Sequence, residues 1–399
     1  MTPSSTRTTP PNHSTRPAPI KRSCASSPKR TPTGLDLGST GVSAPAPRHV
    51  STSQGADGPG TRPVASYRGD VPRHHLVPQM YLRNFADERG LLRLVDRNDL
   101  SRSIPSSVNN ACNEVGFYAW RPGLRADEVD DPSMLDPGHV EGLLSVFEGR
   151  AAAVIAQILQ SGQPPETLEQ RYDLVHFVAL QAARGRRFRE DLSQTATWAA
   201  RQHLRETVTV DHVRHWLTEQ GLPHGRSDIQ AFLDRILGPD GPRLLPDTTF
   251  AIQQALRFAL IDVAPRLWTG LWRIAEFAEP ALLSSDEPVV PWHPDEEPVT
   301  VLTAPVVWLP LGRRHLLEIS HPSSVTTASY DQDPIGPQLV NALVATQAER
   351  WILHHPEDRD LINGTDVGVR TEWADEVLDT RVDGDLVREL RRLRRLPKK

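Results

Sequence analysis

The sequence predicts an α+β fold: one large domain with a mainly helical middle and small antiparallel sheet regions contributed by both flanks, after a disordered N-terminal tail. Three observations predict it. The first 70 residues are too polar to form a core, apolar residues recur at helical spacing from about 136 to 262, and short alternating apolar runs stand on both sides of that region. At 399 residues and 38% apolar content, the chain can bury a sizeable core.

Residues 1–70 form the predicted disordered tail, rich in Pro, Ser, Thr and Arg. They hold 11 of the 36 prolines and a single aromatic residue, Tyr67, so they cannot bury enough apolar surface to offset the entropy of ordering the chain. Nine Lys and Arg against three Asp and Glu give this tail a charge of +6, which leaves −11 on residues 71–399 because the whole chain carries −5. Broad nonspecific affinity for nucleic acid is therefore not expected of the folded part.

Location and several reaction classes are constrained by what the sequence lacks. We expect a cytoplasmic protein with no membrane span, because no secretory apolar segment and no run of 18 apolar residues is present. Cys24 and Cys112 are the only cysteines, which excludes a disulfide framework and a cysteine zinc site. Residues 30–397 contain no lysine, which excludes phosphate-binding loops and Schiff-base chemistry.

The first predicted elements after the tail are strands. Residues 90–108 alternate apolar and polar positions around turn signals, and "GFYAW" follows at 116–120, so a small antiparallel meander is expected. The paired histidines His74 and His75 stand at its beginning. The domain that starts here is predicted to extend as one α+β unit over residues 71–380.

The middle of the chain is predicted to be helical. Asp136 as N-cap and Pro137 at the first helical position begin a helix whose apolar residues, from Val140 to Ile158, recur on one face. A second long helix runs from about 166 to about 205, with Gly185 as the position where it can break. Further helices are expected near 210–220, 227–237 and 248–262.

Strands return in the last third of the sequence. Residues 270–290 contain two apolar runs separated by Glu279-Pro280, which predicts a hairpin, and strands are expected at 306–312 and 316–320. A helix at 334–350 and the strand "RWILHH" follow. Residues 381–399 are predicted to be a basic helix that docks on the acidic domain, because Leu386, Leu390 and Leu393 form an apolar stripe. Nucleic-acid binding through this helix is the alternative, which we do not favour.

The paired histidines are the first candidates for chemistry. His74 and His75 point in different directions, so a metal site would need further ligands from Asn109, Asn113, Glu114 or the distant Asp286. The structural alternative is that one histidine anchors the strand while Pro78 fixes the turn. A His-Asn-His nuclease finger begins in a similar way, but the next histidine, His139, lies 64 residues beyond His75, so the finger is incomplete.

Three further positions could carry chemistry or only structure. Gln181 and Arg184 project from one helix face. The arginine there could grip a carboxylate or phosphate, or form an internal ion pair or loop clamp, for instance with Glu148 or Asp286. Asp286 in "SSDEPVV" fits an Asx turn before a proline or a general-base or metal-binding carboxylate. The residues alone leave both interpretations open.

Taken together, "HHLVPQMYLRNF", "NNACNEVGFY", "VEGLLSVFE", "FVALQAARGRRFR", "SSDEPVV" and "LPLGRRHLL", with Asn341 downstream, resemble the bacterial domain of unknown function 4238 family over about residues 72–355. The resemblance assigns no activity. It implies that the polar residues at the family's recurring positions form one cluster: His74, His75, Pro78, Asn109, Glu114, Tyr118, Glu148, Gln181, Arg184 and Asp286.

Two functions of different class follow as hypotheses. The first is a metal-assisted hydrolase acting on a phosphodiester or nucleic acid, in which a divalent metal is held by His74, His75, Glu114 and Asp286. Its catalytic residues would be His75, Glu114, Arg184 and Asp286, with Arg184 stabilising charge in the transition state. Asn109, Tyr118, Glu148 and Gln181 would contribute to binding. The second is a noncatalytic binding or regulatory protein, in which the same groups are buried and satisfy one another.

Overall fold

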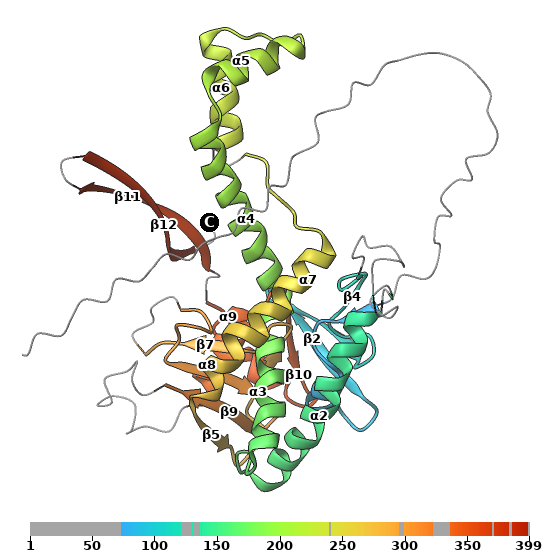
Figure 1. Ribbon diagram of the computed structural model, residues 1–399. Coiled ribbons are helices and arrows are strands. Elements are labelled where there is room, and N and C mark those ends of the chain that lie inside the picture. The colour runs from blue at the N-terminus through green and yellow to red at the C-terminus, as the bar shows by residue number, and fades with distance from the viewer. Residues whose placement is uncertain are drawn as a thin grey trace, which may run out of the picture. The chain divides into compact units, whose positions relative to one another are not determined.

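The structure is a computed structural model that describes residues 73–120, 130, 136, 138–238, 241–294, 299–321, 336–368, 371–382 and 385–397. The chain divides into two units, residues 1–66 and residues 67–399. The predicted disordered tail, residues 1–70, lies outside the described residues. Within the second unit the predicted α+β fold is confirmed, with long helices in the middle of the chain and antiparallel sheets formed by the flanking segments (Figure 1).

The N-terminal flank supplies four strands. Strand β1, Arg73–His75, pairs antiparallel with β4, Asn113–Val115, and β2, Leu91–Asp96, forms a hairpin with β3, Asp99–Ser107. The helical turns α1, Gln79–Leu82, and η1, Arg83–Phe85, connect β1 to β2. The predicted strand at 116–120 is wrong, because Gly116 has a left-handed φ of 70° and turns the chain directly after β4.

Both flanks contribute strands to one sheet, whereas the sequence predicted a separate sheet region in each flank. Its strand order is β3-β2-β10-β6, where β10 is Trp351–His354 and β6 is Ser284–Ser285. A second sheet has the order β5-β9-β8-β7, with β5 Leu271–Glu276, β9 His315–Ser320, β8 Val306–Pro310 and β7 Val290–Trp292. The predicted strands at 306–312, 316–320 and "RWILHH" correspond to β8, β9 and β10.

The predicted hairpin at 270–290 is wrong, because its two apolar runs join different sheets. β5 pairs with β9, whereas β6 pairs with β10. Between them the backbone amides of Phe277 and Ala281 donate to the carbonyls of Arg314 and Arg313. The connection therefore lies along the β8–β9 turn instead of closing a hairpin of its own.

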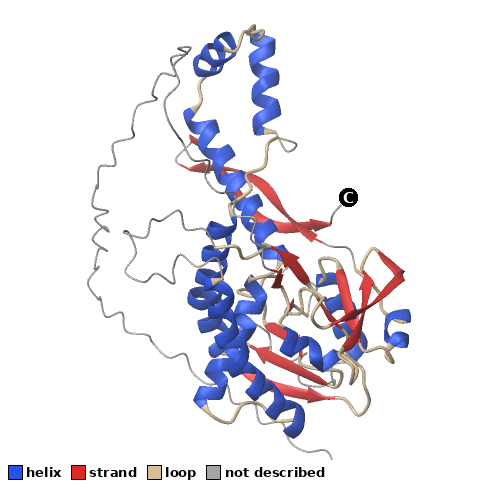
Figure 2. Cartoon of the chain, turned by 90° about the vertical axis from the view of Figure 1, so that its right-hand side faces the viewer, coloured by secondary structure: helices blue, strands red, loops and turns tan. Residues whose placement is uncertain are grey.

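Two of the long helices meet at the predicted break. Helix α3, Leu168–Ala183, begins with a capping box between Thr167 and Gln170, and α4, Arg186–Thr207, begins immediately after Gly185. Helix α2, His139–Ser161, starts later than predicted: Gly138 is its N-cap, and the expected cap, Asp136, instead accepts a hydrogen bond from the Gly138 amide. Pro137 lies outside the described residues. In Figure 2 the long helices stand on one side of the strands.

The remaining predicted helices of the middle region are confirmed. They are α5, Val210–Glu219, and α6, Arg226–Leu237, which share a small core with the end of α4, and α7, Thr248–Arg257. A π-helical turn, η4, Phe258–Val263, joins α7 to α8, Ala264–Trp268. Pro265 explains this turn, because its ring displaces the carbonyl four residues earlier and favours wider winding.

The C-terminal flank contains one confirmed helix and one correction. Helix α9, Pro337–Gln347, lies within the predicted 334–350, and the short α10, Arg359–Asn363, follows β10. The predicted basic helix at 381–399 is wrong: β11, Thr371–Val382, pairs antiparallel with β12, Asp385–Pro397. The register pairs acidic positions of β11 with basic positions of β12, such as Glu376 with Arg391.

Helix α2 alone among the described helices is long and apolar enough, by length and composition, to cross a membrane. Its buried residues, including Val140, Leu144, Ile155 and Ile158, belong to the main hydrophobic core, which α3 also enters. That packing accounts for the buried apolar residues of α2, whereas Leu143 and Val146 on the same helix are exposed.

Tyr81 connects α1 to both four-stranded sheets. Its side chain is fully buried, and its hydroxyl donates to the carbonyl oxygen of Pro310 in β8 at 2.5 Å and lies 2.9 Å from Oγ of Ser284 in β6. Because a buried carbonyl without a donor is costly, this hydroxyl fixes where the two sheets approach one another.

We expect Tyr81→Phe to lower the free energy of unfolding by about 1–3 kcal/mol, because it leaves the Pro310 carbonyl without its donor. Urea unfolding followed by far-UV circular dichroism measures the change. Tyr172→Phe on α3, where the tyrosine is 48% exposed, is the matched control and should cost less than about 0.5 kcal/mol. Equal losses in the two variants would contradict the role assigned to the Tyr81 hydroxyl.

Candidate functional site

The junction between α3 and α4 gathers most of the polar residues that the sequence singles out. Arg184 ends α3 in a helical conformation, and Gly185 then takes an extended conformation with φ −78° and ψ 177° before α4 begins. Because the chain changes direction within one residue, consecutive side chains leave the junction towards different parts of the fold. Arg184, Arg186 and Arg187 each find their partners in a different segment.

Arg184 is the most deeply embedded of these residues, with only 4% of its surface exposed. Its Nε donates to the carbonyl oxygen of Leu76 at 2.9 Å, Nη2 to the carbonyl oxygen of His75 at 3.0 Å, and Nη1 to Oε1 of Glu148 at 2.6 Å. One planar guanidinium at the end of α3 thus joins the end of β1 to α2.

Gln181 and Tyr118 complete this arrangement. Nε2 of Gln181 donates to the same Leu76 carbonyl at 3.1 Å, and the Tyr118 hydroxyl donates to the Arg184 carbonyl at 3.0 Å. Burial raises the pKa of the Tyr118 hydroxyl, so it stays protonated and remains a donor. We call Arg184, Gln181, Tyr118, Glu148 and the carbonyls of His75 and Leu76 the arginine knot.

Both histidines belong to the same region but face different partners. Nδ1 of His74 accepts from the Tyr118 amide at 2.7 Å, so the neutral ring carries its proton on Nε2. Burial lowers the pKa of His74, and the charges of Arg189 and His75 lower it further. Nε2 of His75 lies 3.1 Å from the Asn109 carbonyl, and burial is the main cause of its lowered pKa. Asn109 therefore takes part through its backbone.

Glu114 and Asp286 are near the junction but not in the knot. Glu114 accepts from Nε of Arg186 at 2.8 Å and from its Nη2 at 2.7 Å. Asp286 is buried and accepts from the backbone amides of Glu349, Arg350 and Trp351 at 2.8–3.1 Å. This carboxylate holds the start of β10, which is a structural role.

The four predicted metal ligands do not fit a metal ion. His74 uses Nδ1 for a backbone amide, Glu114 is paired with an arginine, and Asp286 is taken by three amides. Across the part of the chain that the structure describes, no group of three or more His, Cys, Asp or Glu side chains is placed to hold a metal. Of the predicted cluster, Glu148 and Tyr118 bond to Arg184 and Gln181 shares an acceptor with it. Glu114 and Asp286 have other partners.

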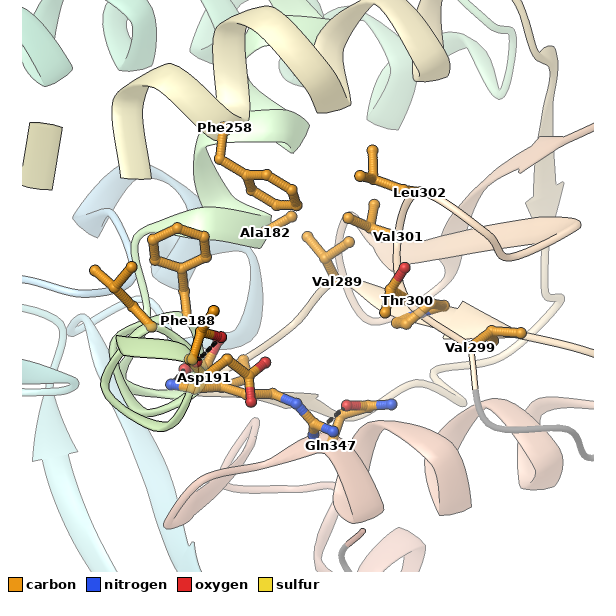
Figure 3. Close-up of a pocket in the computed structure, with 15 residues that line it drawn as sticks. Ala182, Phe188, Asp191, Phe258, Val289, Val299, Thr300, Val301, Leu302 and Gln347 are labelled. Atoms are coloured by element: carbon orange, nitrogen blue, oxygen red, sulfur yellow. Dashed lines mark hydrogen bonds between the residues drawn. The ribbon is translucent and has the colours of Figure 1, made fainter. Parts of the chain in front are cut away.

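On the other side of the junction lies a cavity of about 480 Å³ (Figure 3). Its apolar wall comes from α3, α4, η4, the start of β7 and the loop before β8: Ala182, Phe188, Leu192, Phe258, Val289, Pro291, Val299, Val301 and Leu302. Its polar edge consists of Arg187, Asp191, Thr195, Glu287, Thr300 and Gln347. A mostly apolar wall with a few polar groups along one edge is typical of a small-molecule site.

The pKa of Glu287, a carboxyl group on the polar edge, is strongly raised. Its Oε1 accepts from the Arg187 amide at 3.0 Å, and its carboxyl lies against Gly185, where a Cβ atom would approach the two oxygens to 2.0 and 2.2 Å. Burial, opposed by that amide and reinforced by the charges of Asp286 and Glu349, raises the pKa of Glu287 to about 8. At neutral pH its carboxyl group is therefore largely protonated.

Sequence reasoning missed Glu287, Arg187 and Gly185 as parts of a site. Glu287 lies in the segment "SSDEPVV", but the pattern of that segment favours Asp286, the residue before it, as the candidate. Asp286 and Glu287 leave the backbone on opposite sides, and only the fold decides which side is packed and which is hollow. Gly185, expected only as a helix break, also makes room for the Glu287 carboxyl.

A family model described as "Protein of unknown function (DUF4238)" matches residues 73–358, which is more than half of the chain. No curated protein and no solved structure matches.

We expect Arg184→Lys to lower the free energy of unfolding by about 3–5 kcal/mol, because lysine cannot serve three acceptors in one plane and leaves buried groups unpaired. Arg314→Lys is the control: Arg314 also donates to one carbonyl and one carboxylate, Phe277 O and Glu276, but its side chain is 44% exposed. That change should cost less than about 1 kcal/mol. Urea unfolding measures both changes. Equal losses of unfolding free energy in the two variants would show that the buried hydrogen bonds of Arg184 contribute no more than exposed ones.

The raised pKa of Glu287 predicts a specific dependence of stability on pH. Between 4.5, the ordinary value, and about 8, the folded protein holds a proton that the unfolded chain has lost, so stability falls as pH rises. The slope is at most about 1.4 kcal/mol per pH unit for one proton. Asp286, whose pKa burial raises to about 6, adds its own dependence only below that pH.

We therefore expect Glu287→Gln to gain stability relative to the wild type by about 2–3 kcal/mol between pH 6 and pH 8, since glutamine keeps an acceptor but does not ionise. Denaturant unfolding at several pH values measures this. The exposed Glu279→Gln should follow the wild-type curve. An unchanged slope in Glu287→Gln would mean that Glu287 ionises normally in the folded protein.

Proposed function

Because the chain belongs to the DUF4238 family of proteins of unknown function, its membership names no reaction, and we propose from the geometry that it is a noncatalytic binding protein for a small molecule with an apolar body and one polar end. The observation that carries this proposal is the cavity beside the α3–α4 junction. Its volume of about 480 Å³ lies within the range of ligand sites, and its polar groups lie along one edge.

The arginine knot supports the same proposal. A catalytic arginine must be able to reach its substrate. In Arg184 all three guanidinium nitrogens donate to protein acceptors instead. Tyr118 and Gln181 are also engaged with backbone carbonyls. These groups hold the junction rigidly, and the next residues, Arg187 and Phe188, enter the cavity wall. The knot thus acts as the support of a binding site.

The metal-assisted hydrolase stays a prediction that the geometry does not favour. It would require His75, Glu114 and Asp286 to direct free donor atoms at one point, and each has a protein partner elsewhere. Hydrolysis of a generic phosphodiester by the wild type in the presence of a divalent metal, abolished by Asp286→Asn without loss of stability, would restore it.

We expect saturable binding of a neutral solvatochromic probe such as 6-propionyl-2-dimethylaminonaphthalene, with an emission shift to the blue as it leaves water. Thr195→Trp, at the exposed rim of the cavity, should weaken this binding by about tenfold or more by filling the mouth. Thr207→Trp is the matched control, because it lies on the same helix and its hydroxyl makes the same bond to the carbonyl four residues earlier.

The control variant should bind like the wild type, and thermal unfolding of both variants checks that each is folded. Absence of saturable binding to the wild type, or identical affinities of the two variants, would contradict the proposed site.

A further inference from the structure

The cavity's polar edge holds more acids than bases. Asp191 and Glu287 line it, with Arg187 as its cationic member. Behind Glu287 lies the buried Asp286, and Glu349 is close enough to act on both carboxyls. Because Glu287 holds a proton at neutral pH, the negative charge around the Arg187 guanidinium comes from the other three carboxyl groups, Asp191, Asp286 and Glu349.

The other charged groups nearby do not reverse this balance. Arg187 donates through Nη1 to Oε1 of Gln347 at 2.5 Å, and Arg186 faces Glu114. Cys112 lies within reach of both Asp286 and Glu287, but burial raises the pKa of its thiol, which stays neutral. A ligand that arrives with negative charge would meet unfavourable potential at this edge, whereas a positive charge would relieve it.

Aromatic rings stand next to the acidic edge. Phe188 from α4 and Phe258 from η4 have ring centroids 5.3 Å apart with planes tilted by 31°. Figure 3 shows both rings in the cavity wall, with Phe188 beside Asp191. The faces of aromatic rings attract organic cations, most strongly where water is excluded.

We propose that the ligand of this cavity is an organic cation, an amine or quaternary ammonium group on an apolar body, whose charge lies between Asp191, Glu287 and the two phenylalanine rings. This inference rests on the proposed binding function and names its ligand class. Arrival of the cation favours the ionised form of Glu287. At neutral pH, where that carboxyl holds a proton, binding releases the proton to solvent while the ligand keeps its own charge.

The experiment compares three probes with one apolar chain and different heads: octyltrimethylammonium, octanol and octanoate. Isothermal titration calorimetry at pH 7 should give the cation an affinity about tenfold higher than that of octanoate. Repeating the titration in two buffers of different ionisation enthalpy should reveal proton release with the cation and none with octanol. The quaternary head cannot itself titrate, so the proton comes from the protein.

Variants identify the source of the effect. Glu287→Gln should abolish the proton release and lower the affinity for the cation severalfold while leaving octanol binding unchanged. Asp191→Asn, a separate carboxylate on α4, should lower the affinity for the cation and keep the proton release. Glu279→Gln, exposed and remote from the cavity lining, should behave like the wild type.

The outcomes separate the two proposals. Octanoate binding as tightly as the cation would overturn the ligand class while leaving a binding cavity in place. Preferred binding of the cation without proton release would overturn the placement of its charge beside Glu287. Failure of all three probes, together with failure of the neutral fluorescent probe, would overturn the binding function itself.

Discussion

The side chain of Arg184 is the constraint on which the rest of this structure depends. One guanidinium binds two successive carbonyls at the end of β1, those of His75 and Leu76, and the Glu148 carboxylate of α2. Because a buried arginine must satisfy its donors, these three segments can only pack where the fork allows. The end of α3 is thereby fixed against the N-terminal strands, and the chain must turn at Gly185 to begin α4.

The cavity is a consequence of that turn. Gly185 leaves room for the Glu287 carboxyl, which accepts from the amide of Arg187 near the start of α4. The α3–α4 junction therefore has two sides. On one side the arginine knot satisfies its polar groups, and on the other side, which faces the cavity, the pKa of the Glu287 carboxyl is raised. Stability and binding are served by opposite faces of one junction.

The sequence predicted the features that depend on local pattern. Helical periodicity located α3, and a lone glycine located its end, because both are properties of neighbouring residues. The pairing of β6 with β10 and of β11 with β12 depends on which strand lies alongside, and the periodicity of one segment does not predict its partner. The same limit applies to the site. The sequence singles out Arg184, but whether its donors face protein or ligand depends on carbonyls 108 and 109 positions away.

Those separations also bear on how the chain is made. Strand β1 meets its arginine only after residue 184 has emerged from the ribosome, and β2 gains its partner β10 only after residue 354. Until then the apolar residues of the N-terminal segment have no complete core to enter. The four-stranded sheet therefore stays incomplete through most of the chain's synthesis, and unpaired strand edges of this kind are prone to aggregation.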